Sequence, residues 1–380
     1  SASDFMVLTI RKLPTANAGV DATICQNQTH TLSGSASNQS SVLWTTSGNG
    51  TFTSGNSLTA VYTPGSVDIS NGTVTLTLTV SAMSPCTISS SDTKVLVIQK
   101  SPTASAGNDA TICQNQTKTL SGTASNQASV IWTTSGNGTF NSTNSLTAVY
   151  TPGSDDITSG SVTLTLTANA LSPCTVSASD LMILTILKLP TANAGVDATI
   201  CQNQTNSLSG TATNQSSVLW TTSGNGTFSS TSSLTPVYTP GTTDITNGSA
   251  SLTLTTYAVS PCSVPVSDAM ILTIRKLPTA NAGNDATICQ NQTHTLSGTA
   301  TNHLSVQWST SGNGTFTNGN TLTAVYNPGT IDIINGTVTL TLTATAISPC
   351  TVSAIDNMVL SIQKEPIVSA GSDYTICEGD

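Results

Sequence analysis

The segment 73–80 alternates between hydrophobic residues and threonines, with Val74, Leu76 and Leu78 in one set and threonines in the other. Side chains two residues apart lie on the same face of a strand, so this pattern predicts a strand with one buried and one solvated face. Similar short patterns fill the chain, and helical periodicity is almost absent. We therefore expect an all-β protein without a helix longer than about two turns.

A second pattern is centred on Trp44. Val42 and Trp44 share one face, Ser47-Gly48-Asn49-Gly50 is typical of a hairpin turn, and Phe52 is expected on the returning strand. An exposed aromatic ligand platform is the alternative, but the alternation places Trp44 inward, in a core. The equivalent aromatic residues are Trp44, Trp132, Trp220 and Trp308, and Phe52, Phe140, Phe228 and Phe316.

The whole pattern repeats every 88 residues without insertion or deletion, which sets the domain organisation. The complete copies, repeats 1 to 4, are 13–100, 101–188, 189–276 and 277–364. Residues 1–12 match the last strand of a copy, and residues 365–380 match the start of one, so we expect a section of a longer array. Met6, Leu8 and Ile10 lie on one face, and we expect residues 1–12 to pair with a preceding domain or with another copy.

Each repeat contains about seven short strand patterns, separated by turn signals, as in an immunoglobulin-like β-sandwich. Charged residues are 7% of the chain and the net charge is −9. No basic patch exists that would bind nucleic acid, and no apolar run is long enough to insert into a membrane.

The cysteines form two series, one after Thr-Ile and one after Ser-Pro. Two cysteines in each small β-repeat favour disulfides and an extracellular location. A zinc site needs cysteines or histidines at short spacing, and the cysteine series lack it. We therefore predict no metal-thiolate site and no cofactor.

Sandwich geometry suggests how the cysteines pair. The first strand should end at one pole, near the next repeat, whereas the last hairpin turns at the other pole, about 30 Å away. A disulfide needs Cα atoms within about 7 Å. The predicted bonds therefore join neighbouring repeats: Cys25–Cys174, Cys113–Cys262 and Cys201–Cys350, with Cys86, Cys289 and Cys377 pairing outside these repeats. If the first strand folds back, the bonds lie within repeats: Cys25–Cys86, Cys113–Cys174, Cys201–Cys262 and Cys289–Cys350.

Three aspartates recur in the repeats. Asp68 is followed four residues later by Gly72, a spacing that favours a single capped turn. Calcium is the alternative, with Asp21, Asp68 and Asp92 as weak candidate ligands if they approach one another. No serine, histidine and aspartate recur together, and paired carboxylates are lacking, so we expect no enzymatic activity.

The segments Pro14–Cys25, Trp44–Gly50 and Asp68–Gly72 resemble a variant of polycystic-kidney-disease (PKD) type domains. The resemblance implies tandem modules of very long secreted surface proteins of bacteria, often those that use the type IX secretion route. The acidic pair that follows the tryptophan in standard PKD domains is absent after Trp44, so no charged site is implied.

These observations predict a structural protein of the bacterial cell surface, either a filament or an adhesin stalk. The alternative is a set of spacer or carbohydrate-binding modules in a large secreted hydrolase. Leu43, Ile131 and Leu219 should face outward and form a possible assembly surface with other copies of the chain, although singly exposed aliphatic residues are common. The threonine-rich faces also offer attachment points for surface glycans.

Overall fold

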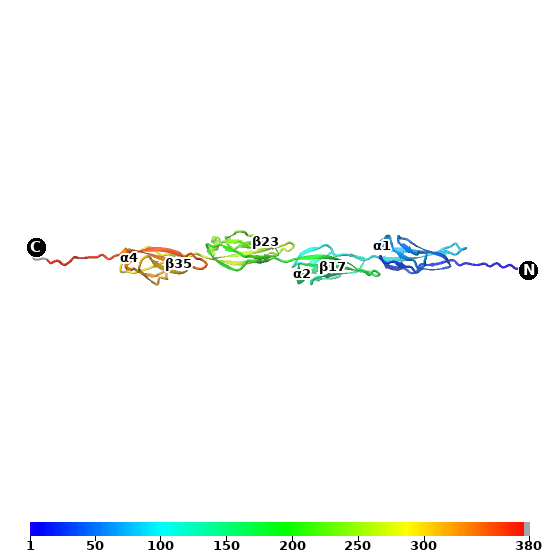
Figure 1. Cartoon of the computed structure of the whole chain (residues 1–380), viewed down its shortest axis with the longest axis horizontal. Coiled ribbons are helices and arrows are strands. Elements are labelled where there is room, and N and C mark those ends of the chain that lie inside the picture. Colours follow the sequence, from blue (N-terminus) through cyan, green and yellow to red (C-terminus); the bar gives the residue numbers. More distant parts are fainter. Residues whose placement is uncertain (376–380) are drawn as a thin grey trace. The chain divides into compact units, whose positions relative to one another are not determined.

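The computed structural model describes residues 1–375, and strands dominate it. Contacts divide the chain into two units, Ser1–Lys188 with Ser260–Cys262, and Leu189–Val259 with Ser263–Asp380. The same order of strands, with one short helix, recurs in all four repeats (Figure 1). The chain is thus a tandem array of immunoglobulin-like β-sandwiches, which confirms the expected fold class.

Repeat 1 has two layers. One is a four-stranded sheet in the order β2 (Ala22–Cys25), β9 (Ser90–Gln99), β8 (Thr73–Ala82) and β5 (Gln39–Thr46). The other contains the pair β1 (Thr15–Asn17) and β4 (Ser35–Ser37), and the sheet β3 (His30–Thr31), β7 (Val61–Thr63) and β6 (Thr51–Thr53). Helix α1 (Ser66–Asn71) connects β7 to β8.

The other repeats have the same elements at equivalent positions. In repeat 2 they are β10 (Thr103–Ser105), β11 (Ala110–Cys113), β12 (Lys118–Thr119), β13 (Thr123–Ser125), β14 (Gln127–Thr134), β15 (Thr139–Phe140), β16 (Val149–Thr151), α2 (Ser154–Ser159), β17 (Ser161–Ala170) and β18 (Ala178–Leu187). In repeat 3 they are β19 (Thr191–Asn193), β20 (Ala198–Cys201), β21 (Asn206–Ser207), β22 (Thr211–Thr213), β23 (Gln215–Thr222), β24 (Thr227–Phe228), β25 (Val237–Thr239), α3 (Thr242–Asn247), β26 (Ser249–Ala258) and β27 (Val266–Arg275). In repeat 4 they are β28 (Thr279–Asn281), β29 (Ala286–Cys289), β30 (His294–Thr295), β31 (Thr299–Thr301), β32 (His303–Thr310), β33 (Thr315–Thr317), β34 (Val325–Asn327), α4 (Thr330–Asn335), β35 (Thr337–Ala346) and β36 (Ala354–Gln363).

The first strand of each sandwich changes layers. In repeat 1, β1 pairs antiparallel with β4, and after a bend at Gly19 the chain continues as β2, which pairs parallel with β9. The register places Cys25 opposite Gln99, at the end of the last strand. Cys86 lies in the connection between β8 and β9, at the opposite end of β9. The two cysteines of one repeat are therefore held at opposite poles.

The expected hairpin around residues 47–50 is wrong. β5 pairs with β8 in one layer, whereas β6 pairs with β7 in the other, so this segment crosses between layers. Gly48 and Gly50 are not among the glycines with positive φ, so they do not serve a hairpin turn. The crossing surrounds a buried aspartate, which is described below.

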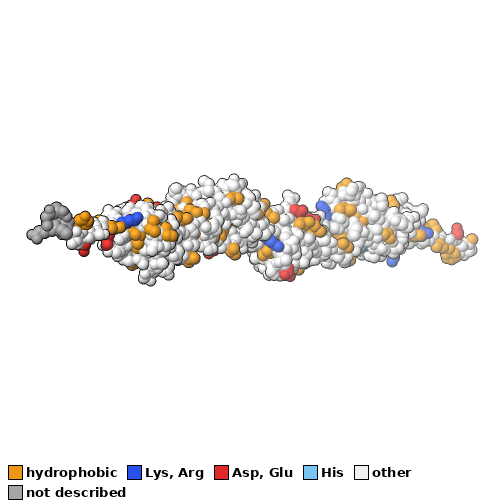
Figure 2. Space-filling model, turned by 60° about the vertical axis from the view of Figure 1, so that its left-hand side comes forward, with side chains coloured by type: hydrophobic (Ala, Val, Ile, Leu, Met, Phe, Trp, Pro, Cys, Tyr) orange, Lys and Arg blue, Asp and Glu red, His pale blue; other side chains and the backbone are white. Residues whose placement is uncertain are grey.

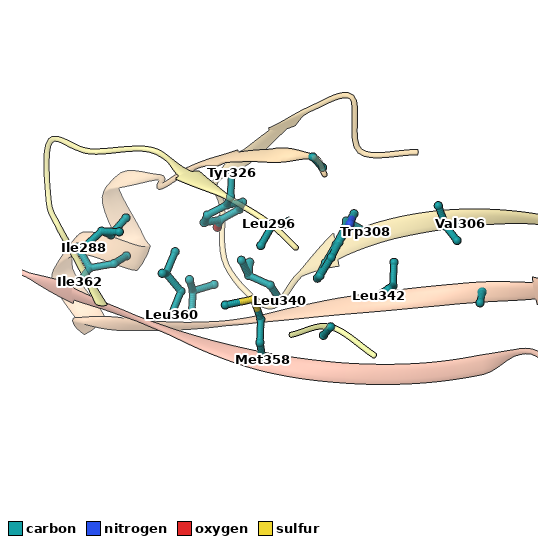
Figure 3. Close-up of a cluster of buried hydrophobic side chains, with 14 residues drawn as sticks. Ile288, Leu296, Val306, Trp308, Tyr326, Leu340, Leu342, Met358, Leu360 and Ile362 are labelled. Atoms are coloured by element: carbon teal, nitrogen blue, oxygen red, sulfur yellow. The ribbon is translucent and has the colours of Figure 1, made fainter. Parts of the chain in front are cut away.

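The tryptophans lie in the core. Trp44, Trp132, Trp220 and Trp308 are only 1–2% exposed. In repeat 4, the Trp308 ring packs among Leu340, Leu342 and Met358, which lie on the other long strands of its own sheet (Figure 3). The phenylalanines are partly buried at the edge of the core, where the Phe52 ring centroid lies 4.9 Å from that of Tyr62. The alternation in β8 is confirmed, since Val74, Leu76 and Leu78 are buried.

Residues 1–12 form no strand, and the side chains of Met6, Leu8 and Ile10 are exposed. In the described part of the chain, this segment pairs with no strand. Each of the four repeats already contains its own last strand, so none has an open position for it. Residues 365–375 also form no strand. No helix in residues 1–375 is long and apolar enough to cross a membrane.

Repeat 1 has one departure in its core. Lys94 is 3% exposed and occupies the position of the buried residues Met182, Met270 and Met358. Its Nζ lies 3.1 Å from Nε2 of His30. Burial lowers the pKa of Lys94, although the Asp21 carboxylate opposes this effect. Burial and the Lys94 charge lower the pKa of His30.

We expect Lys94→Met to raise the free energy of unfolding of repeat 1 by about 1–3 kcal/mol, because it removes a buried cation that has no carboxylate hydrogen-bonded to it. Hydrogen exchange of the repeat 1 amides measures the change. Lys12→Met, at an exposed position, is the control and should have little effect. Faster exchange in Lys94→Met would show that the lysine stabilises repeat 1.

We also expect repeat 1 to lose stability as the pH falls from about 8 to about 5. The folded state lowers the pKa of His30 below its ordinary 6.5, so in this range the unfolded chain binds a proton that the folded chain does not, and stability falls. The lowered pKa of Lys94 acts in the same direction as the pH falls through 10.5. Repeat 3, with Asn206 and Met270 at these positions, is an internal control. After correction for intrinsic exchange rates, equal losses of protection in both repeats would contradict this prediction.

Candidate functional site

The recurring Asp68 lies in a cluster that we call the aspartate clasp: the Asp68 carboxylate, the hydroxyls of Tyr62 and Thr46, and the backbone N–H groups of Gly65 and Asn49. Tyr62 donates to Oδ2 of Asp68 at 2.6 Å, and Gly65 donates to the same oxygen at 2.9 Å. Asn49 N–H donates to Oδ1 at 3.1 Å, and the hydroxyl oxygens of Thr46 and Tyr62 lie 2.9 Å apart. All four repeats contain the clasp, with Tyr–Asp distances of 2.6–2.7 Å.

Helix α1 positions this carboxylate. Gly65 is its N-cap and Asp68 its third residue, so the carboxylate caps the first turn. Gly72 ends the helix in the left-handed conformation, with φ of 73°. The structure thus contains the capped turn that the Asp68–Gly72 spacing predicted.

The clasp explains the glycines of the crossing segment. A Cβ at Gly48 would overlap the Asp68 carboxylate, and a Cβ at Gly50 would overlap the Tyr62 hydroxyl. Their role is therefore to let the backbone approach the buried carboxylate closely. Sequence reasoning missed Thr46 and Tyr62 as partners, although both recur at fixed distances from Asp68.

The electrostatics of the clasp favour an ionised carboxylate. Burial alone would raise the pKa of Asp68, but hydrogen bonds from Tyr62 and from the backbone N–H groups of Gly65, Asn49 and Gly50 lower it overall. Burial and the bond to Asp68 raise the pKa of Tyr62 to about 12. With Asp68 1% exposed, its carboxylate is a poor candidate for a base or nucleophile and a good structural anchor.

The other calcium candidates have separate partners. Oδ1 of Asp21 accepts the N–H of Val95 at 2.8 Å, and Oδ2 of Asp92 accepts the N–H of Ala18 at 2.7 Å. These bonds attach the first strand to β9. Within residues 1–375, no three His, Cys, Asp or Glu side chains lie together as a metal would require.

Disulfides join consecutive repeats. The structure forms Cys25–Cys174, Cys113–Cys262 and Cys201–Cys350, with a Cα–Cα distance of 4.9 Å in each, rather than the pairs within repeats. A bond within repeat 1 would require Cys25 and Cys86, which lie at opposite poles. We use the name joint for such a disulfide together with the linker between the two repeats.

The joint of repeats 1 and 2 has a three-residue linker, since β9 ends at Gln99 and β10 begins at Thr103. Sγ of Cys174 lies 3.4 Å from the carbonyl oxygen of Gln99, so the second repeat contacts the end of the last strand of the first. Repeats 3 and 4 have an equivalent joint, where Sγ of Cys350 lies 3.4 Å from the carbonyl oxygen of Arg275.

The Cys-Gln-Asn-Gln motif fixes the first cysteine of each joint. Gln28 N–H donates to the Cys25 carbonyl at 2.9 Å, and Cys25 N–H donates to Oε1 of Gln28 at 3.0 Å. Gln204 and Cys201 make the same pair of bonds. The recurring glutamine thus closes the turn that carries the cysteine, a role that sequence reasoning did not assign.

The joint of repeats 3 and 4 also buries apolar surface. Cys201, Cys350 and Ala346 form a small buried cluster against which Leu277 packs, and Leu277 N–H donates to Oε1 of Gln202 at 3.2 Å. Cys201 is 1% exposed and Cys350 is 5% exposed. The disulfide is thus shielded by the two repeats that it connects.

Two described cysteines remain unpaired: Cys86, which is half-buried, and Cys289, which is exposed. Cys377 lies outside the described residues. Of the suggested assembly surface, Leu43 and Ile131 are 54% and 41% exposed, whereas Leu219 is half-buried.

No protein-family model and no curated protein matches the chain. Among solved structures, the protocadherin GammaB4 extracellular domain aligns at 14% identity with a TM-score of 0.44, over 92% of this chain and 66% of that one. A three-domain Ig structure of titin aligns at 12% identity with a TM-score of 0.42, over 70% of this chain and 99% of that one. At such identities the similarity is limited to β-sandwich domains in tandem.

We expect Asp156→Asn to destabilise repeat 2 by about 2–3 kcal/mol, because the amide accepts fewer of the buried hydrogen bonds from Tyr150, Gly153 and Asn137. Asp155→Asn in the same helix is a matched control, since Asp155 is exposed, and it should change stability little. Hydrogen exchange of repeat 2 measures both variants. Equal effects of the two substitutions would rule out a structural role for the clasp.

We expect the double variant Cys201→Ser, Cys350→Ser to keep its folded sandwiches, because each core is separate, but to open its joint. Trypsin cleavage after Lys276 should become about tenfold faster, since local opening controls access to a linker. Cleavage after Lys100, at the joint that keeps Cys25–Cys174, is the internal control. An unchanged rate at Lys276 would show that the disulfide does not hold the joint closed.

Proposed function

We propose that the chain is a structural extracellular protein, part of a surface fibre or of an adhesin stalk. The disulfide joint is the observation that supports this most. A linker of three residues and a disulfide between neighbours restrict bending, and a force along the chain would be shared between the linker and the covalent bond. A protein that only needs its domains to be connected has no use for such joints.

An extracellular location is supported by the disulfides, which form and persist in oxidising compartments. The surface fits this location. On the face shown in Figure 2, red and blue side chains occur only at isolated places among white and orange ones. Charged residues are 7% of the whole chain, so hydroxyl and amide groups cover the repeats and offer positions for glycans.

A structural role also agrees with how the repeats use their recurring polar side chains. Asp21, Asp68 and Asp92 each bind a backbone N–H or a tyrosine of the same sandwich. None of these aspartates has a histidine or second carboxylate as a hydrogen-bond partner. We therefore infer that the repeats have no catalytic activity. In a fibre, their partners would be other copies of the chain.

The resemblance of Pro14–Cys25 and Trp44–Gly50 to PKD-type modules adds support for a secreted bacterial surface protein. Electron microscopy of the protein from its native source tests the proposal. We expect ordered fibres or stalks. Dispersed particles with glycoside hydrolase activity, or saturable binding of the chain to polysaccharides, would favour the modules of a secreted hydrolase instead.

A further inference from the structure

The disulfides give the chain covalent connections besides the backbone. In repeat 2, Cys174 is bonded to Cys25 of repeat 1, and residues 174–188 lead from it along the last strand to repeat 3. A covalent path from repeat 1 to repeat 3 thus crosses repeat 2 through its last strand alone. This path omits everything in repeat 2 that precedes Cys174.

A second covalent path crosses the same repeat through its first strand. Residues 101–113 lead from repeat 1 to Cys113, which is bonded to Cys262 of repeat 3. We call the two segments, 101–113 and 174–188, the short routes of repeat 2. Each of them joins the two neighbours of this repeat without the rest of the sandwich.

The two short routes of a repeat lie side by side. β11 ends one route and β18 forms most of the other, and the two strands pair in parallel, from Ala110 opposite Leu184 to Cys113 opposite Leu187. Both routes run in the same direction, so tension along the chain stretches the two strands together instead of pulling them apart. The equivalent short routes of repeat 3, which pair in the same way through β20 and β27, are 189–201 and 262–276.

The remainder of the sandwich lies outside both routes. Residues 114–173 contain the clasp, helix α2 and Trp132, and they connect the end of one route to the start of the other. Cys113 is bonded directly to repeat 3 and Cys174 directly to repeat 1, so this long segment is a slack bridge beside two short connections. Tension along the chain is therefore carried by the short routes.

The lengths of the segments show how large this effect is. Each short route of repeat 2 reaches at most about 50 Å, since an extended chain spans no more than about 3.6 Å per residue. Its strand is already extended in the folded repeat, so complete unfolding of the sandwich adds only about 20 Å. Without the disulfides, unfolding would release all 88 residues of the repeat and add about 270 Å.

We propose that the disulfides make the array a tether of nearly fixed length, in which a sandwich can unfold under tension without lengthening the chain. The first and last strands of each sandwich are the tether, and the other elements cover them. The proposal rests on the proposed function, because only a chain that carries tension, as a fibre or stalk does, uses this property. It goes beyond the stiffness of the joints, since the length stays limited even when a fold is lost.

Stretching of single full-length molecules, held by handles at their two ends, tests the tether. In every molecule Cys86, Cys289 and Cys377 are replaced by serine, so that no other disulfide forms. We expect the oxidised chain to show no extension step longer than about 20 Å. The same chain reduced with dithiothreitol should show a step of about 270 Å for each sandwich that unfolds.

Two double variants separate the tether from the general effect of losing a disulfide. Between the handles, the shortest covalent path uses the other two disulfides but not Cys113–Cys262. The variant Cys113→Ser, Cys262→Ser, stretched in guanidinium chloride so that all sandwiches are unfolded, should therefore be as long as the oxidised parent. Under the same conditions the variant Cys201→Ser, Cys350→Ser should be about 2.5-fold longer, because its shortest path contains that many more residues.

Long steps in the oxidised chain would overturn the proposal, as would equal lengths of the two variants. A reduced chain without long steps would also overturn it, since the sandwiches and not the disulfides would then limit the length. If the oxidised chain shows long steps while native material forms fibres or stalks, the tether fails and the proposed function remains. If the oxidised chain keeps its length but native material contains only dispersed particles with hydrolase activity, the reverse holds.

Discussion

The parallel pairing of β2 with β9 is the constraint on which the joints depend. Its register fixes Cys25 opposite Gln99, at the pole where the last strand leaves the sandwich for the next repeat. An antiparallel first strand in the same position would place this cysteine at the other pole, near Cys86, and close the disulfide within one repeat. The bonds that Asp21 and Asp92 accept from Val95 and Ala18 hold the first strand in this position.

The aspartate clasp has a similar role inside each sandwich. A chain that is short of charged residues still buries one carboxylate per repeat, and a buried charge is tolerable only when its oxygens are fully hydrogen-bonded. Tyr62 and Gly65 supply those bonds from the segment before α1, and Asn49 supplies one from the crossing segment. The clasp thus fixes the crossing between layers, the start of α1 and the tyrosine in one cluster.

The sequence predicted the features that depend on periodicity. Alternation around Val74, Leu76 and Leu78 predicted the buried face of β8, and the 88-residue period predicted the repeated sandwiches. The direction of each strand then favoured cysteine pairs between repeats over pairs within one repeat. These inferences need only the direction in which each strand runs.

Other features could not be predicted, because they depend on contacts distant in sequence. Ser47–Gly50 has the composition of a hairpin turn, but Gly48 leaves room for the Asp68 carboxylate and Gly50 for the Tyr62 hydroxyl, and both partners are distant in sequence. A lysine is not expected in a core, so the residue type gave no sign that Lys94 is buried. Only the methionines at the equivalent positions of the other three repeats indicate that this position faces the core.

The repeats combine separate cores with disulfides that are shared between neighbours. Every sandwich has its own core and clasp, and the residues of each core come from a single repeat. Every joint, in contrast, needs both neighbours, because each disulfide takes one cysteine from each. Each core thus belongs to one repeat, whereas each disulfide belongs to two. An array of this kind can be lengthened by adding repeats without any change to the fold of those already present.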